Sequence, residues 1–320
     1  MKTEEEITLF LIGSKFFKTN LNRLAAQAEG VRNSAEIEYL HRMRVASRRL
    51  LNGLSTFSEA IPKRKLNKWN LEIRSLVRVL GKSRDLDVQI KYLRSNRKNI
   101  KTKNYKIGIE RLILRLEQRR NQKQPGVVEA IYEFNESSFK RDIKNIFDAR
   151  NYKKRLTIKK LHDKKFINKI KKIISSKITG VLVFDETIYD QQNTAELHEL
   201  RKAIKQLRYT LETFDFHYGG CIKMHIKIIK NIQDILGRIH DYDMWVELIP
   251  KFIIKEKRRT EKYFGNIKNF GNIERGLLHF LKEVNNKRKK EYKQFILYWD
   301  ELKSKKYWES IPVDLNSLIK

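Results

Sequence analysis

The sequence predicts an all-α fold of two four-helix bundles, related by an internal pseudo-two-fold repeat. Long segments place apolar residues three and four positions apart, which is the period of an amphipathic helix. Proline, which breaks helices, occurs only 4 times in the 320 residues. Alternating patterns typical of strands are almost absent. The one short β-like run, 181–184, is expected to lie in a connection.

Segments with the helical period follow one another in both halves of the chain. The clearest are 40–57, 66–80, 107–120, 127–147, 197–216 and 222–236. A chain of 320 residues forms either one large domain or two similar ones. Because each half has room for about four helices, two packed four-helix bundles are the expected architecture.

Two short blocks of the first half recur in the second half in the same order. The pairs are His41-Arg-Met-Arg-Val-Ala-Ser-Arg-Arg-Leu with His198-Glu-Leu-Arg-Lys-Ala-Ile-Lys-Gln-Leu, and Leu80-Gly-Lys-Ser-Arg-Asp-Leu-Asp with Leu236-Gly-Arg-Ile-His-Asp-Tyr-Asp. Their offsets differ by a single residue, which indicates duplication of a helical unit. We expect the first bundle to span residues 1–160 and the second 161–320. The boundary is expected in the Lys-rich stretch between 150 and 193.

The chain carries an extreme positive charge. It contains 70 Lys and Arg residues against 38 Asp and Glu residues, a formal net charge of +32. Such a surplus repels itself in the folded state, so an anionic polymer or surface is the simplest compensation. A composition biased toward lysine would instead leave the charge spread over the surface. The positions of the charges therefore decide between the two interpretations.

The rest of the composition indicates the cytoplasm. Cys221 is the single cysteine, which excludes an internal disulfide and agrees with a reducing compartment. The acidic first residues lack the features of a secretory signal, and no apolar run approaches the roughly 20 residues of a membrane span. We expect a cytoplasmic protein without a membrane partner. The sequence leaves its oligomeric state open.

Basic residues form a narrow stripe on each of the two matched helices. At about 100° per residue, the stripe lies opposite the apolar residues that would face the core. It contains His41, Arg44 and Arg48 in the first half and His198, Arg201, Lys205 and Arg208 in the second. Like charges at these spacings destabilise a helix by a few tenths of a kcal/mol per pair, and a solvated face would mix acids among them. The pattern therefore favours an anion-binding face.

The helix after each stripe adds further basic residues. Arg74 and Arg78 share a face in the first half, and Lys223, Lys227 and Lys230 share one in the second. Two glycines, Gly81 and Gly237, then mark expected helix stops or tight crossings. Arg84 follows the first glycine, and Arg238 and His240 follow the second.

Two Asp-x-Asp pairs follow these glycines. Asp85 with Asp87 and Asp241 with Asp243 have the oxygen ligands that Mg²⁺ or Ca²⁺ prefers. Asp directly after a helix break is also a good N-cap, and acids in a first turn complement the helix dipole. We favour this capping role, or one of holding neighbouring arginines, over a metal site.

Motifs for catalysis are absent from the sequence. It contains no Walker loop, dinucleotide fingerprint or Gly-x-Ser-x-Gly elbow. His41 and His198 begin equivalent helices, where an imidazole can donate to phosphate or simply pack between bundles. His217 and His225 lack the company of a zinc site. We expect a binding protein without catalytic residues, cofactor or metal.

The matched blocks resemble the CHAD domain, the conserved histidine α-helical domain. The first half carries His41-x-x-Arg-Val-Ala-x-Arg-Arg-Leu and Leu80-Gly-x-x-Arg-Asp-Leu-Asp, and the second half carries His198-x-Leu-Arg-Lys-x-x-Lys-x-Leu-Arg-Tyr and Gln233-Asp-x-Leu-Gly. The resemblance covers most of the chain. It implies two helical bundles with a basic groove or channel between them that binds inorganic polyphosphate.

Motif positions in the resemblance imply the binding residues. These are His41, Arg44, Arg48, Arg49, Arg74, Arg78, Arg84, His198, Arg201, Lys202, Lys205 and Arg208. Lys230 joins them from its place on the second helix. The chain departs from the family pattern at Leu51 and Gln206, where basic residues are usual, so the first half is expected to make fewer contacts.

Inorganic polyphosphate is therefore the expected partner. A nucleic acid is the second choice, although base stacking calls for aromatic residues among the cations, and Tyr209 is the only one close to the stripe. A metal-dependent phosphoanhydride hydrolase is the third. The purpose of binding, whether storage, targeting to polyphosphate granules or regulation of an enzyme, stays open.

Overall fold

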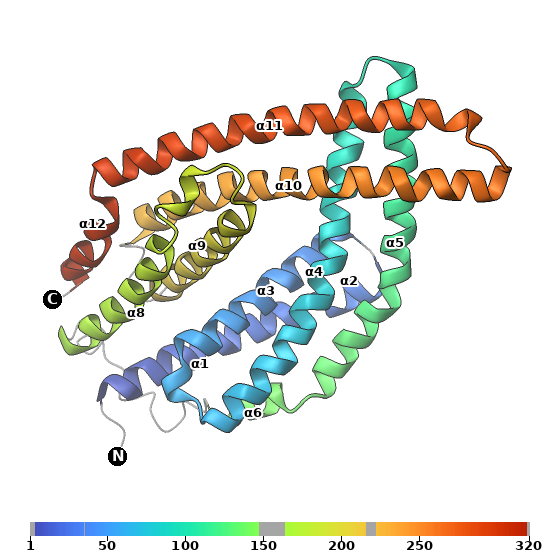
Figure 1. Cartoon of the computed structure of the whole chain (residues 1–320). Helices are drawn as coiled ribbons and strands as arrows, with labels where there is room; N and C mark the ends of the chain where they lie inside the picture. Colours follow the sequence, from blue (N-terminus) through green and yellow to red (C-terminus); the bar gives the residue numbers. More distant parts are fainter. Residues whose placement is uncertain (1–3, 35, 147–163, 216–221, 319–320) are drawn as a thin grey trace.

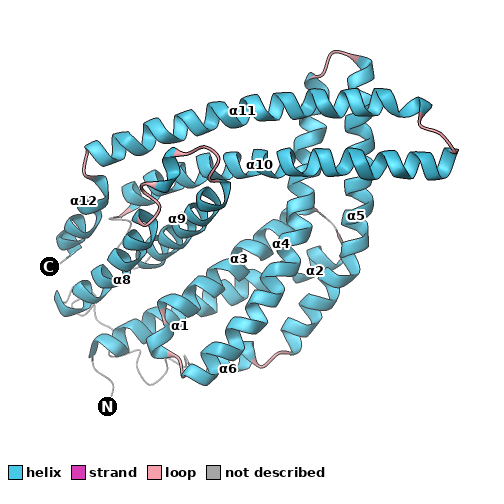
Figure 2. Cartoon of the chain, in the orientation of Figure 1, coloured by secondary structure: helices cyan, strands magenta, loops and turns pink. Residues whose placement is uncertain are grey.

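The computed structural model describes residues 4–34, 36–146, 164–215 and 222–318, and these residues form helices joined by turns and loops (Figures 1 and 2). No strand occurs among them. The all-α prediction is therefore confirmed. None of the helices in these segments is long and apolar enough to cross a membrane.

The described helices fall into two successive sets along the chain. The first half contains α1 (Glu4–Ala25), α2 (Ala28–Arg32), α3 (Ile37–Thr56), α4 (Lys63–Asn99), α5 (Lys103–Glu136) and α6 (Phe139–Ile146). The second half contains α8 (Lys164–Leu182), α9 (Thr194–Asp215), α10 (Lys223–Phe264), α11 (Gly271–Ser304) and α12 (Tyr307–Asp314). The basic stripes lie on α3 and α9. The Leu-Gly blocks lie on α4 and α10.

Two long helical hairpins cross at one end of the molecule. The hairpin α4–α5 of the first half meets the hairpin α10–α11 of the second, with α5 packed on α11 (Figure 1). The shorter helices α1, α3, α8 and α9 lie beside the other ends of these hairpins. The pseudo-two-fold relation between the halves stays a prediction, and part of its expected boundary, residues 147–163, lies outside the described residues.

A separate cluster of buried side chains lies at each end of the molecule. One cluster runs through α1, α3, α8, α9 and the near ends of the long helices. The other, which we call the crossing core, joins the far ends of α4, α5, α10 and α11 around Leu93, Leu112, Trp245 and Phe280. Both halves contribute to the crossing core, so the hairpins are locked to each other.

Glycine allows the close approach of α5 and α11 in the crossing core. A Cβ atom at Gly276 would collide with the backbone carbonyl of Tyr105, and one at Gly108 would collide with that of Ile273. Each helix therefore presents a glycine to the backbone of the other. A side chain at either position would push the two hairpins apart.

The predicted helix stops at Gly81 and Gly237 are wrong. Gly81 lies inside α4, which has 37 residues, and Gly237 lies inside α10, which has 42. A glycine costs a helix interior only about 1 kcal/mol, which packing along such long helices readily outweighs. The Asp-x-Asp pairs are therefore mid-helix residues, and the expected N-cap role does not apply to them.

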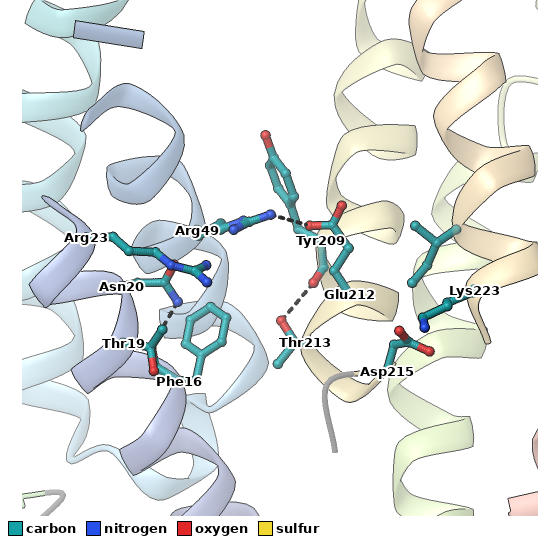
Figure 3. Close-up of a pocket in the computed structure, with 11 residues that line it drawn as sticks. Phe16, Thr19, Asn20, Arg23, Arg49, Tyr209, Glu212, Thr213, Asp215 and Lys223 are labelled. Atoms are coloured by element: carbon teal, nitrogen blue, oxygen red, sulfur yellow. Dashed lines mark hydrogen bonds and ion pairs between the residues drawn. The ribbon is translucent and has the colours of Figure 1, made fainter. Parts of the chain in front are cut away.

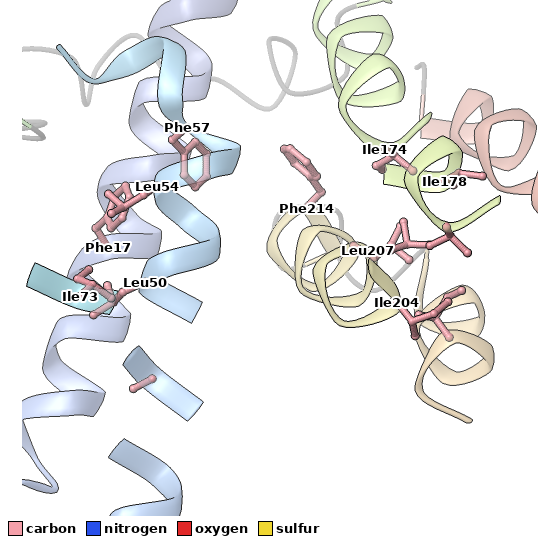
Figure 4. Packing of buried hydrophobic residues seen from close by; sticks show 14 of the residues in the cluster. Phe17, Leu50, Leu54, Phe57, Ile73, Ile174, Ile178, Ile204, Leu207 and Phe214 are labelled. Carbon is pink, nitrogen blue, oxygen red and sulfur yellow. The ribbon is translucent and has the colours of Figure 1, made fainter. Parts of the chain in front are cut away.

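The predicted apolar faces of α3 and α9 are confirmed. Met43, Leu50 and Leu54 of α3, and Ile204 and Leu207 of α9, are fully buried. Figure 4 shows Leu50 and Leu54 of α3 packed toward α1, while Ile204 and Leu207 of α9 lie on the side of α8. The two helices therefore turn their basic faces toward each other across the interface between the halves.

The β-like run 181–184 is only partly a connection. Its first two residues complete α8, which ends at Leu182, and Val183 and Phe184 form the turn that follows. The same spacing of apolar residues serves a helix end and a turn, so a short run of this kind does not distinguish them.

Candidate functional site

Four cations converge where α3 and α9 face each other. Arg44 and Arg48 come from α3, and Arg201 and Lys205 come from α9; we call these four residues the central cluster. All four are half-buried. Their spacing of four residues on each helix places both members of a pair on the same face. The basic groups of α3 and α9 therefore come together at one interface.

Burial and mutual repulsion lower the pKa values of Arg44, Arg201 and Lys205. Burial lowers the pKa of Arg44 to about 10, with further lowering by Arg48 and Arg201. Burial also lowers the pKa of Lys205 to about 6, and Arg201, Arg48 and Arg44 add to this effect. The pKa of Arg201 falls for the same first reason. The cluster therefore holds its charges at an electrostatic cost.

Few carboxylates compensate these charges. Asp85 of α4 lies 3.6 Å from Nη2 of Arg44. Asp241 of α10 faces Arg201 and Lys205, but its burial raises its pKa. In the described part of the chain, no carboxylate forms an ion pair with Arg48, Arg201 or Lys205.

Donor groups of the cluster are also left without acceptors. The Nε atoms of Arg44 and Arg201 are both buried and have no hydrogen-bond partner among the described groups. A buried donor without an acceptor costs about 1–3 kcal/mol. An anion with several oxygen atoms would satisfy these donors and neutralise the surplus charge together.

Histidines extend the site from both halves. Nδ1 of His198 lies 3.1 Å from Nδ1 of His240 on α10, and burial followed by Arg201 lowers the pKa of His240 to about 3. Burial and then Arg84 lower the pKa of His41. These imidazoles are neutral near pH 7 and offer N–H donors without adding charge.

His240 was missing from the binding residues predicted from the sequence. It occupies the same place in its block as Arg84 in the first block, directly before the Asp that both blocks contain. In the structure Arg84 adjoins His41, as His240 adjoins His198. The equivalence of His240 and Arg84 in the two aligned blocks was therefore a signal that could have identified His240 from the sequence.

Two predicted binding residues are engaged in an internal network. Nη2 of Arg49 donates to Glu212 at 3.0 Å and so joins α3 to α9 (Figure 3). Nη1 of Arg208 donates to the same carboxylate at 2.8 Å. Arg208 also donates from Nε to Gln233 at 2.9 Å. Arg49 therefore ties the halves together through Glu212, Arg208 holds that carboxylate in place within the second half, and an anion must compete with Glu212 for both arginines.

A cavity of about 370 Å³ adjoins this network at one end of the interface (Figure 3). Phe16 and Ile226 supply apolar lining, and Arg23 and Lys223 add exposed cations. Tyr209 lines the cavity as well and lies close enough to influence the pKa values of Arg44 and Arg201. The interface between the halves therefore opens into this hollow rather than closing beyond the central cluster.

The outer basic residues lie along the flanking helices. Arg74 and Arg78 are exposed on α4, and seven-residue steps place them on the faces of Gly81 and Asp85. Gly81 itself faces the central cluster, because a Cβ there would lie 3.9 Å from Nε of Arg44.

The outer basic residues of the second half lie on α10 and α9. Lys230 is exposed on α10, one seven-residue step before Gly237. Lys202 is also exposed, but it is paired with Glu199 at 2.6 Å. The side chains of these outer residues are thus accessible to solvent. They lie outside the half-buried central cluster.

Each Asp-x-Asp pair divides its two carboxylates between separate partners. The first member, Asp85 or Asp241, faces the central cluster. The second member is bound to an arginine: Asp87 accepts from Nε of Arg120 at 2.8 Å, and Asp243 accepts from Nε of Arg288 at 2.7 Å. The alternative that these acids hold arginines in place is therefore confirmed. Across the described segments, no group of three His, Cys, Asp or Glu residues is arranged to hold a metal.

Fold and site together define an all-α protein with a basic interface between two helical halves. A family model, the CHAD domain, matches residues 15–250, which include both copies of each block. The chain belongs to the CHAD domain family, and the resemblance seen in the motifs is confirmed. A search of curated proteins found no match.

A solved structure has the same fold. The crystal structure of the CHAD domain from the plant Ricinus communis aligns with 89% of this chain and 91% of its own, with a TM-score of 0.58. The sequence identity is 18%, so this likeness concerns the arrangement of the helices.

Proposed function

We propose that this protein binds inorganic polyphosphate in the basic interface between α3 and α9. The observation that supports this proposal is the central cluster, in which four basic side chains from two helices, three of them arginines, share the two carboxylates Asp85 and Asp241. A chain of phosphate groups offers closely spaced negative charge along a line, which matches cations arranged along two facing helices. A cytoplasmic location, including polyphosphate granules, belongs to the same proposal.

Binding would proceed by electrostatic capture. Each phosphate contact by Lys or Arg releases counterions condensed on the polymer, so the affinity falls steeply with salt. Arginines contribute bidentate contacts to phosphate oxygens. Because helices hold the cations in place, little conformational entropy is lost. Outer residues such as Arg74, Arg78 and Lys230 would add contacts to long polymers, so affinity should rise with chain length.

We infer a binding role without catalysis. Asp87 and Asp243 are engaged by arginines, and Asp85 lies beside Arg44, so these carboxylates have charge partners already. A hydrolase would release phosphate from polyphosphate in the presence of Mg²⁺ and would lose this activity on Asp85→Ala. That result would replace the binding proposal with an enzymatic one.

Nucleic acid is the second candidate because it shares the charge argument. Tyr209 lies next to the cluster, but the guanidinium of Arg208 covers its ring at 4.7 Å from the centroid. A base would have to displace this contact in order to stack. If RNA displaced polyphosphate at equal phosphate concentration, nucleic acid would become the better assignment.

Charge reversal at the centre of the interface tests the proposal. Arg44→Glu combined with Arg201→Glu should abolish polyphosphate binding and leave the helical content unchanged. Lys287→Glu combined with Lys293→Glu, two exposed positions on α11, changes the net charge equally and should weaken binding far less. Equal losses in both double variants would show that only net charge matters and would refute a localised site.

A further inference from the structure

A solvent-exposed tip ends the α10–α11 hairpin. The helix α10 ends at Phe264, Gly265 follows with a φ of 69°, and a short 3₁₀ turn (Lys268–Phe270) leads into α11. Figure 1 shows this end projecting beyond α5, away from α3 and α9. We call residues 262–268 the hairpin tip.

Large apolar side chains are concentrated on the hairpin tip. Tyr263 is 82% exposed, Phe264 is 62% exposed and Ile267 is 40% exposed. The two rings touch each other edge to face, with their centroids 4.8 Å apart. Single exposed apolar residues are ordinary, but adjacent ones at a projecting end mark a site of interaction.

Exposed cations precede and follow these apolar side chains along the chain. They are Lys255, Lys257, Arg258, Lys262 and Lys268. Of the neighbouring acids, Glu261 is exposed, whereas Glu256 is buried and bound by arginines. The end of the hairpin therefore combines apolar and positively charged surface. We call Tyr263, Phe264 and Ile267 the apolar point and the exposed cations the positive collar.

We propose that the hairpin tip docks peripherally on an anionic lipid surface. Tyr263, Phe264 and Ile267 would enter the boundary between headgroups and acyl chains, where aromatic side chains are favoured. The cations of the collar would lie against the negative headgroups. From the sequence we expected no membrane partner, because no apolar run is long enough to span a bilayer. A short apolar tip after a long helix leaves no comparable pattern in the sequence.

Other occupants fit these features less well. A second copy of the tip would bring two positive collars together, which repel each other. A nucleic acid would use the cations but would leave Ile267 without an apolar partner. The lipid boundary satisfies the apolar point and the positive collar together. The tip is also remote from the central cluster, so this proposal does not depend on polyphosphate binding.

Vesicle cosedimentation with the full chain tests the proposal. The protein should bind vesicles of phosphatidylcholine with phosphatidylglycerol and bind vesicles of phosphatidylcholine alone much less. Tyr263→Ser combined with Phe264→Ser should lower the partition coefficient by at least about tenfold. Tyr132→Ser on α5, where the tyrosine is 64% exposed, is the matched control and should leave partitioning unchanged. Lys262→Gln with Lys268→Gln should reduce the preference for phosphatidylglycerol.

Fluorescence locates the contact. The native tryptophans, Trp69, Trp245, Trp299 and Trp308, are all buried, so Tyr263→Trp introduces an exposed one. Its emission should shift to the blue on adding anionic vesicles. The proposal is overturned if the emission does not shift or if the serine variant binds vesicles normally. It is also overturned if Arg44→Glu with Arg201→Glu abolishes vesicle binding, because lipid headgroups would then occupy the central cluster.

Discussion

Arginines in two regions of the molecule have opposite surroundings. Near the crossing core, the carboxylate of Glu256 is 1% exposed and accepts hydrogen bonds from Arg111, Arg115 and Arg259 at 2.8–3.4 Å. In the central cluster, cations instead face other cations, and buried Nε atoms of Arg44 and Arg201 lack acceptors.

The difference separates cations that stabilise the fold from those that we propose to bind an anion. A buried charge that is paired and hydrogen-bonded is part of the fold, and removing its partner is costly. A set of partly buried cations with too few acids raises the free energy of the folded state, and a bound anion would lower it again. Net charge alone cannot make this distinction, because both regions contain several arginines.

The largest expected effect is on binding at the central cluster. Arg44→Gln combined with Arg201→Gln removes two charged donors without introducing repulsion from new acids. The affinity for polyphosphate should fall by about a thousandfold. Stability toward urea should stay the same or increase, since repulsion within the cluster is relieved. Calorimetric titration and urea unfolding measure the two quantities, and a large loss of stability would indicate that these arginines are structural.

The reverse pattern is expected for Glu256→Gln near the crossing core. This change leaves Arg111 and Arg115 without their buried counter-charge and should lower the free energy of unfolding by about 3 kcal/mol. Polyphosphate affinity should stay unchanged at a temperature where the variant is folded. Burial alone raises the pKa of Glu256, but hydrogen bonds from Arg115 and Arg259 hold it below its ordinary value. The stabilisation is therefore present above the ordinary pKa and is lost as the pH falls through the lowered one.

The glycines of the long helices provide a matched pair for the next prediction. Gly276→Ala places a Cβ against the carbonyl of Tyr105 and should destabilise the crossing core by about 2 kcal/mol. Gly237→Ala lies in α10 with no atom within 4 Å and should stabilise the protein by up to about 1 kcal/mol. Thermal or urea unfolding of both variants checks the signs. Equal effects would contradict the close packing of α5 on α11.

The last predicted effect is a pH dependence from Lys205, whose pKa of about 6 lies far below its ordinary value. A bound polyanion favours the protonated amine, so binding takes up protons at pH 7. Affinity should rise as the pH falls from about 8 to 6, by up to about tenfold per unit, and level off below 6. Titration in buffers of different ionisation enthalpy measures the uptake.

Lys205→Gln provides the control for this pH dependence. The variant should lose the proton uptake and should be more stable than the native protein at pH 7, where the native unfolded state binds the additional proton and the folded state does not. Proton uptake that persists in Lys205→Gln would assign the effect to another group, such as His198, whose pKa burial also lowers.

Several features of the site were accessible from the sequence for a physical reason. Residues such as Arg44 and Leu50 lie on opposite faces of α3 because the helical period alone separates them. The two blocks also pointed to equivalent positions in each half. The predicted helix stops at Gly81 and Gly237 were wrong, because a glycine inside a helix costs only about 1 kcal/mol. Packing along the whole helix outweighs this cost, and a short segment of sequence does not reveal that packing.

The sequence by itself determined the helical class, the apolar faces of α3 and α9 and the basic stripes opposite them, since these follow from the spacing of neighbouring residues. Only the tertiary structure decided that the stripes face each other, that Glu212 engages Arg49 and Arg208, and that Asp87 is bound to Arg120. Such partners are far apart in the chain, and any acid could pair with any of many arginines. Which cations lack a carboxylate is settled by how the helices pack.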